Sequence, residues 1–68
     1  MNTLAEELPR QQARCREILE HALALPPASG FFLVASLRAS LSRAERAAAA
    51  GDVAEMARAC ADLQEYQE

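Results

Sequence analysis

Apolar side chains recur along this chain at intervals of three and four residues, in three successive stretches. The first stretch contains Leu4, Leu8, Cys15, Ile18, Leu19, Ala22 and Leu25, the second Phe31, Val34, Leu37, Leu41, Ala44 and Ala48, and the third Val53, Met56, Cys60 and Leu63. This spacing places each set on one face of an α-helix. The pattern therefore predicts three amphipathic helices, at residues 3–25, 30–50 and 53–67.

The breaks between these stretches predict how the helices are connected. Gly51 suits the left-handed position that ends a helix, and Asp52 suits the N-cap of the next one, with Glu55 completing a capping box. So short a connection forces the second and third helices to fold back as an antiparallel hairpin. The first and second helices are separated by residues 26–30, in which Ser29 is the expected N-cap.

The beginning of the first helix is less regular than the rest. Thr3 and Glu6 form a capping-box pattern, but Pro9 either kinks the helix or marks its true start. Gln11 and Gln12 stand where the stripe needs an apolar residue. Either the stripe weakens after the proline, or a buried polar layer fixes the register of the bundle.

These elements predict an all-α fold, a three-helix up-down-up bundle that forms a single domain over residues 1–68, with helices of similar length. A chain of 68 residues buries little surface, so its core is small. Cys15 and Cys60 are expected to be reduced thiols packed as small apolar groups. In an up-down-up bundle the two cysteines lie at similar positions along the bundle axis, so a disulfide between them is the alternative to two reduced thiols.

The net charge and the positions of the charged residues limit the kinds of function that the sequence allows. The net charge is −3, and a chain with an acidic balance is a poor candidate for binding the phosphates of nucleic acid. All seven basic residues are arginine. The best basic group is a loose patch of Arg38, Arg43 and Arg46 on the second helix, the basis of an alternative DNA-binding function. On the first helix, charges at spacings of three and four predict local ion pairs, among them Arg14 with Glu17 and Arg16 with Glu20. Neither a signal peptide nor a membrane span is expected, which favours a cytoplasmic protein.

Little in the sequence resembles catalytic machinery. His21 is the only histidine, it lacks companion metal ligands, and it lies on a different helix face from Cys15. The carboxylates lie on exposed faces beside arginines, and there is no glycine-rich phosphate loop. We therefore expect no enzyme activity, no cofactor, no metal site and no small-molecule substrate.

The feature most suggestive of function is the apolar run from Phe31 to Val34. Four consecutive side chains point almost all round a helix, so a three-helix bundle cannot bury all of them. In one interpretation, some of them cap the end of the bundle against Leu23 and Leu25. Alternatively they form a contact surface for another subunit or partner, consisting of Leu4, Leu8, Phe31 and Phe32.

Several segments carry a resemblance to a known group of proteins. They are Glu7–Arg10, Gly30–Phe31 and Gly51–Val53, followed by Met56, Ala59, Asp62, Leu63, Glu65 and Tyr66. With these segments the chain resembles small uncharacterised helical proteins found in proteobacterial prophage regions. It departs from them in the extra alanines and serines of the second helix. The resemblance implies a phage context and no particular reaction.

The sequence thus predicts a non-catalytic protein-interaction or accessory protein of prophage origin. Its expected partner is itself, as a homodimer or higher oligomer, or another protein. The alternative is a small DNA-associated regulator that uses the arginines of the second helix.

Overall fold

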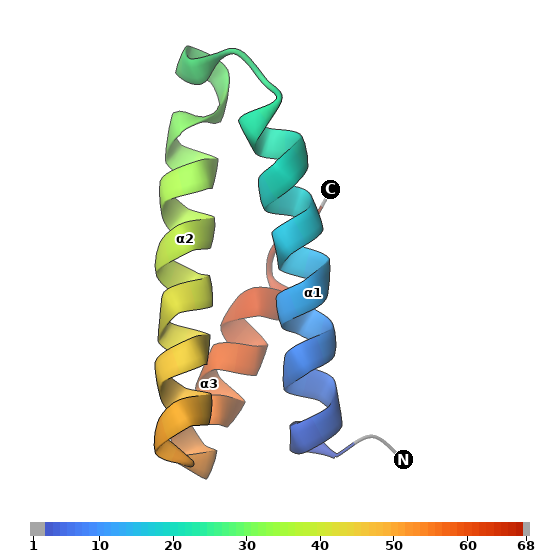
Figure 1. Ribbon diagram of the computed structural model, residues 1–68, viewed down its shortest axis with the longest axis vertical. Coiled ribbons are helices and arrows are strands. Elements are labelled where there is room, and N and C mark those ends of the chain that lie inside the picture. Colours follow the sequence, from blue (N-terminus) through green and yellow to red (C-terminus); the bar gives the residue numbers. More distant parts are fainter. Residues whose placement is uncertain (1–2, 68) are drawn as a thin grey trace.

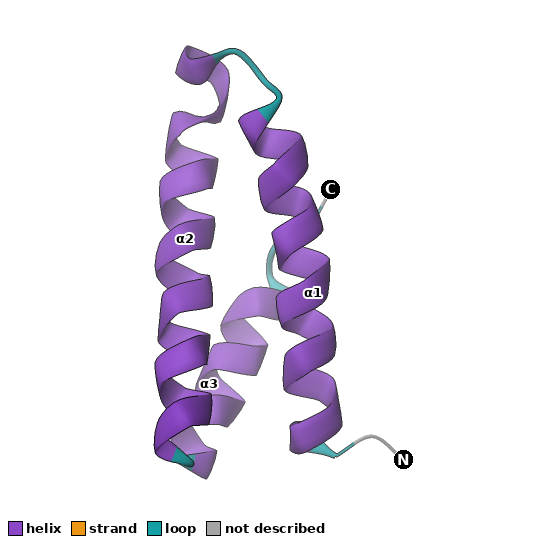
Figure 2. Ribbon diagram, viewed as in Figure 1, coloured by secondary structure: helices purple, strands orange, loops and turns teal. Residues whose placement is uncertain are grey.

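The computed structural model describes residues 3–67 and is built of three helices, with no strand among those residues (Figures 1 and 2). Helix α1 spans Leu4–Leu23, α2 spans Pro27–Ala50 and α3 spans Val53–Gln64. They run up, down and up, and each contacts the other two. The predicted all-α up-down-up bundle is confirmed. Residues 1, 2 and 68 of the predicted domain lie outside the described part of the chain.

Helix α1 begins with the predicted cap and continues through the proline. The backbone N–H of Glu6 donates to Oγ1 of Thr3 at 3.3 Å. This bond satisfies one of the amides that the first turn of a helix leaves without a partner. Because Pro9 lies inside α1, the alternative in which the helix starts at the proline is wrong.

Helix α2 begins three residues earlier than its apolar pattern predicts. It starts at Pro27, and Pro26 occupies the N-cap position without a side-chain hydrogen bond. Proline suits the first helical position because its fixed φ is already helical and its missing N–H would have no partner there. The prediction of Ser29 as the N-cap is therefore wrong: its backbone N–H already donates to the Pro26 carbonyl at 2.9 Å.

The connection between α2 and α3 has the predicted geometry. Gly51 adopts a left-handed φ of 67°, and the N–H of Asp52 reaches back to the Ala47 carbonyl at 3.2 Å. Asp52 then caps α3 by accepting the N–H of Glu55 at 3.1 Å. The two cap residues, Gly51 and Asp52, are enough to reverse the chain, which confirms the antiparallel hairpin of α2 and α3.

The third helix is shorter than predicted. It has 12 residues, against 20 in α1 and 24 in α2, and it ends at Gln64 rather than at residue 67. In Figure 1, α3 lies behind the lower half of the other two helices and stops near their middle. The expectation of similar lengths is thus wrong for α3, and the end of the bundle near the α1–α2 connection is built from two helices only.

The core lies where all three helices meet. Its buried members are Leu8, Cys15, Ile18, Leu37, Leu41, Ala44, Ala59, Cys60 and Leu63. Gln12 is also buried, with 9 % of its surface exposed, and it stands between Leu8 and Cys15 on the inner face of α1. Of the two interpretations of this glutamine, the structure favours the buried polar position over a stripe that simply weakens.

Arginine 14 attaches the end of α3 to α1. Its guanidinium donates to the backbone carbonyl of Leu63 and to that of Tyr66, both at 2.7 Å. These carbonyls lie at the C-terminal end of α3, where partial negative charge accumulates and a cation is favourable. The third donor, Nε, holds Oε1 of Gln11 at 2.9 Å. The predicted Arg14–Glu17 surface pair is therefore wrong.

A second polar group attaches the same end of α3 to α2. The hydroxyls of Ser40 and Tyr66 lie 3.0 Å apart, and Arg43 donates to Oδ2 of Asp62 at 2.9 Å. Partial burial acts to raise the pKa of the Asp62 carboxyl. Hydrogen bonds from Ser40 and Arg43, together with the Arg43 charge, outweigh it and hold that pKa below its ordinary value.

At the other end of the bundle, α1 and α2 approach each other closely at Gly30. A Cβ atom added to Gly30 would lie 2.8 Å from the backbone oxygen of Ala22. Backbone cannot yield as a flexible side chain can, so the two helices would have to move apart.

We expect Gly30→Ala to destabilise the protein by about 1–3 kcal/mol, the usual cost of overpacking. This loss would outweigh the gain in helix propensity, which is at most about 1 kcal/mol. Thermal unfolding followed by circular dichroism measures it. Ser36→Ala, at an exposed position of the same helix, is the control and should cause no loss. Equal or higher stability of Gly30→Ala would contradict the close contact.

Candidate interaction site

The two phenylalanines that the sequence singles out lie at the start of α2 and are exposed. Phe31 exposes 66 % of its surface and Phe32 exposes 86 %. Their ring centroids are 5.6 Å apart and the ring planes meet at 81°, an edge-to-face arrangement. Neither ring belongs to the core, although burial of apolar surface is the main source of stability in so small a domain.

The two leucines predicted to share that surface do not lie on it. Leu8 is only 1 % exposed and belongs to the core, while Leu4 is partly buried against it. Both lie in the first turns of α1, at the end of the bundle opposite to Phe31 and Phe32 (Figure 1). Ala22, at the tip end of α1, follows Leu8 by 14 positions, which corresponds to about 21 Å of helix. The predicted set is corrected to its two phenylalanines.

Other large apolar side chains join the phenylalanines instead. Three leucines around the α1–α2 connection are exposed by 36–52 %. Together with the two rings they form what we call the tip surface, consisting of Leu23, Leu25, Phe31, Phe32 and Leu33. The tip surface occupies the end of the bundle that α3 does not reach. The sequence predicts only that part of the apolar run caps the end of the bundle against Leu23 and Leu25, and it does not predict that these two leucines are themselves exposed.

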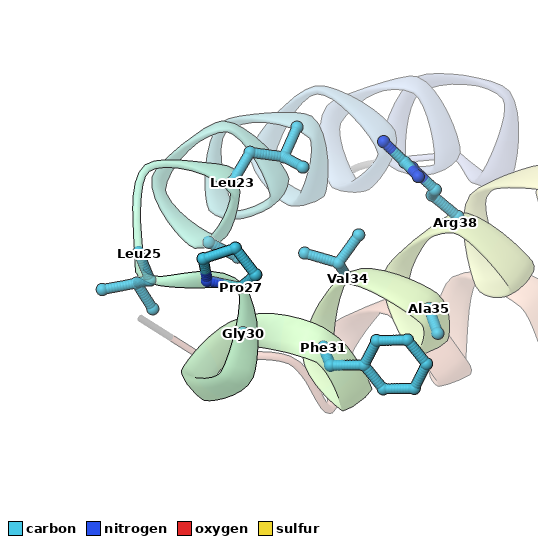
Figure 3. A pocket seen from close by; sticks show the side chains of 9 residues that line it. Leu23, Leu25, Pro27, Gly30, Phe31, Val34, Ala35 and Arg38 are labelled. Atoms are coloured by element: carbon cyan, nitrogen blue, oxygen red, sulfur yellow. The ribbon is translucent and has the colours of Figure 1, made fainter.

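A groove of about 300 Å³ opens between α1 and α2 at this end (Figure 3). Its lining is apolar except for one arginine and consists of Ala22, Leu23, Leu25, Pro27, Gly30, Phe31, Val34, Ala35 and Arg38. In Figure 3, Leu23 and Val34 point toward each other across the groove, and the Arg38 side chain extends across it toward α1. The helical spacing could have found Val34 and Arg38, which follow Phe31 by three and seven residues.

The groove opens on the side of the bundle away from α3. Leu23 follows Arg14 by nine residues, which is half a turn around α1, and Arg14 faces α3. Arg38 precedes Ser40 by two residues, so it points away from the Ser40–Tyr66 contact by about 160°. This face is therefore turned toward the viewer in Figure 1.

The arginines proposed for DNA binding do not gather into one basic patch. Arg43 pairs with Asp62, and Arg46 donates to the hydroxyl of Ser42 at 2.7 Å. Arg38 lies in the apolar groove. Two of the three charges are thus engaged within the molecule, which lowers their availability to phosphates.

The two cysteines are the remaining candidates for reactive groups. Cys15 and Cys60 are both free and buried, so the structure has the reduced pair and not the disulfide. Burial raises the pKa of both thiols, which disfavours the reactive thiolate. Within residues 3–67, no three His, Cys, Asp or Glu side chains are grouped so as to hold a metal ion. No helix in that range is both long and apolar enough to cross a membrane.

Comparison of the chain with protein-family models, with curated proteins and with solved structures gives no match. The function must therefore be argued from the tip surface and the groove themselves.

Proposed function

We propose that this protein is a non-catalytic protein-interaction module that binds through its tip surface and self-associates. One observation carries the proposal: five large apolar side chains are exposed together at the end of the bundle that α3 leaves uncovered. Contiguous exposed apolar surface at one end of a soluble helical domain is typical of a contact with another protein. Exposed apolar surface lowers solubility, and polar residues at these exposed positions would give the same fold without that cost.

The size of the domain supports a partner. A chain of 68 residues obtains only a few kcal/mol from its own core, and small domains of this kind are commonly stabilised by association. Burying the two phenylalanine rings in an interface would remove from water the largest apolar groups that the fold leaves exposed.

The cellular context that we propose is an accessory role in the cytoplasm for a protein of phage or prophage origin. It rests on the sequence resemblance alone, and no observation on the tip surface depends on it. DNA binding remains the alternative function. A gel-shift experiment with duplex DNA tests it, and a salt-dependent retardation would favour it over the protein-interaction function.

The experiment that tests the proposed function is light scattering after gel filtration, over a tenfold range of protein concentration. We expect a dimer or larger species for the wild type and a smaller mass for Phe32→Glu, with unchanged helicity by circular dichroism. Val53→Glu is the matched control, because Val53 is 67 % exposed at the far end of the bundle. A wild-type mass near 7.4 kDa at every concentration would contradict self-association, and unfolding of Phe32→Glu would place that ring in the core.

A further inference from the structure

The arginine in the groove is exceptional among the arginines of this chain. The other six have a hydrogen bond or an ion pair within residues 3–67: Arg10, Arg14, Arg16, Arg43, Arg46 and Arg58. Arg38 has no such partner in the described part of the chain, and its side chain extends across an apolar groove (Figure 3). A cation beside an apolar groove gains from a carboxylate placed over it once a partner excludes water.

A carboxylate without a partner lies on the same face of the molecule. The side-chain carboxylate of Glu20 has no hydrogen bond or ion pair among the described residues. Arg16 reaches across to Glu45 at 3.7 Å instead. The sequence predicts an Arg16–Glu20 pair, and that prediction is wrong. Glu20 precedes Leu23 by three residues and so lies within about 60° of it around α1. The side of the bundle on which the groove opens thus carries one charged side chain of each sign without a partner among the described residues: Arg38 on α2 and Glu20 on α1.

We propose that a second copy of this chain covers the groove, with Arg38 of each copy facing Glu20 of the other. The inference rests on the proposed interaction function and specifies its partner and its geometry. In a two-fold contact every pairing occurs twice, so a face with one acid and one base beside apolar residues is complementary to itself. Leu23 and Phe31 of both copies would pack between the two ion pairs.

The face is large enough for such a contact. The bundle measures 37 × 23 × 15 Å, so the face seen in Figure 1 fits within a rectangle of about 850 Å², and a contact of standard size has to cover nearly all of it. Stable interfaces bury about 800 Å² on each partner. Ala35 and Ser42, three and four residues from Arg38 on α2, have small side chains that leave room for the helices of a second copy. The two copies would form a four-helix layer, with α3 of each on the outside.

Charge reversal tests this geometry with the full chain. Arg38→Glu places two acids together at each of the two contacts, and Glu20→Arg places two arginines there. Like charges facing each other oppose association, so we expect each single variant to weaken the dimer at least about tenfold. The double variant restores opposite charges in exchanged positions, and we expect its dissociation constant to return to within about threefold of the wild type.

The measurement is sedimentation equilibrium at two salt concentrations, with circular dichroism of every variant. Both substituted residues are exposed, so the fold should be retained. Arg58→Glu is the control: it makes the same change in net charge at an exposed position of α3, which lies outside the proposed contact, and the dimer should not weaken. Recovery in the double variant supports the inference.

Three outcomes would overturn it: a monomeric wild type, a dimer that neither reversal weakens, or a double variant as weak as the singles. The second and third outcomes leave the proposed function standing if Phe32→Glu still dissociates the dimer. In that case the interface would lie on the part of the tip surface that faces away from the groove. Loss of the dimer in Arg38→Glu but not in Phe32→Glu would instead retain the groove contact and remove Phe32 from the interaction surface.

Discussion

Truncation of Leu8 to alanine is expected to cost about 2–5 kcal/mol of folding free energy, the range for a leucine removed from a packed core. Leu8 is 1 % exposed and contributes to the cluster where the three helices meet. A domain of this size has a total stability of about 3–10 kcal/mol. The variant should therefore be largely unfolded at moderate temperature, which urea denaturation followed by circular dichroism would measure.

The matched control is Phe32→Ala, which removes an even larger side chain from a position that is 86 % exposed. Its effect on the stability of the isolated chain should stay within about 0.5 kcal/mol. Together the two variants separate the core from the tip surface within the set of residues that the sequence grouped as one. Wild-type stability of Leu8→Ala would return Leu8 to the surface and contradict the packing of α1.

Replacement of Arg14 by alanine is expected to cost about 1.5–3 kcal/mol, the range for hydrogen bonds made by a charged group. The lost bonds are those that hold the carbonyls of Leu63 and Tyr66 at the end of α3. In a domain of 60–100 residues, 1 kcal/mol corresponds to a shift of about 4–8 °C in Tm, so the change is easily measured.

Arg16→Ala is the control for this prediction. Arg16 differs from Arg14 in making only a 3.7 Å ion pair with Glu45, in which both side chains are more than half exposed. Such pairs contribute less than about 1 kcal/mol. We expect the loss of stability in Arg14→Lys to lie between the losses in Arg14→Ala and Arg16→Ala. An ammonium group keeps the charge, but it cannot bind two carbonyls as the planar guanidinium does. Equal losses for Arg14→Ala and Arg16→Ala would show that the two carbonyl contacts add nothing.

The fluorescence of Tyr66 gives a local readout of the same change, because Tyr66 is the only tyrosine and the chain has no tryptophan. Its hydroxyl is held beside Ser40 when the end of α3 is docked. In Arg14→Ala we expect this signal to change at lower temperature than the helicity of α1 and α2 does.

The fold could be predicted from the sequence because its signals are local. The left-handed glycine at position 51 and the caps at Thr3 and Asp52 depend on a few neighbouring atoms, and each has the predicted geometry. The start of α2 was missed because two successive prolines are compatible with both a loop and a first helical turn. The length of α3 was overestimated because its end is fixed by Arg14, a contact 49 residues away in sequence.

The candidate site could be predicted only in part. The apolar run identified Phe31 and Phe32, since no bundle can bury all sides of one helix. Leu8 was misplaced because spacing alone does not tell which end of a helix another helix covers. Arg38 was grouped with Arg43 and Arg46 by charge, whereas the structure separates them by their partners.

The short third helix also sets how stability is distributed along the bundle. Backbone amides are protected from hydrogen exchange by the free energy needed to open them locally, which is lowest where packing is thinnest. Where three helices meet, opening exposes the core. At the tip, opening separates only α1 from α2, so amides around Ala22 and Gly30 should exchange well before those around Cys15 and Leu37. The end of the molecule with most exposed apolar surface is thus also its most easily opened part, and binding there would be coupled to a gain in order.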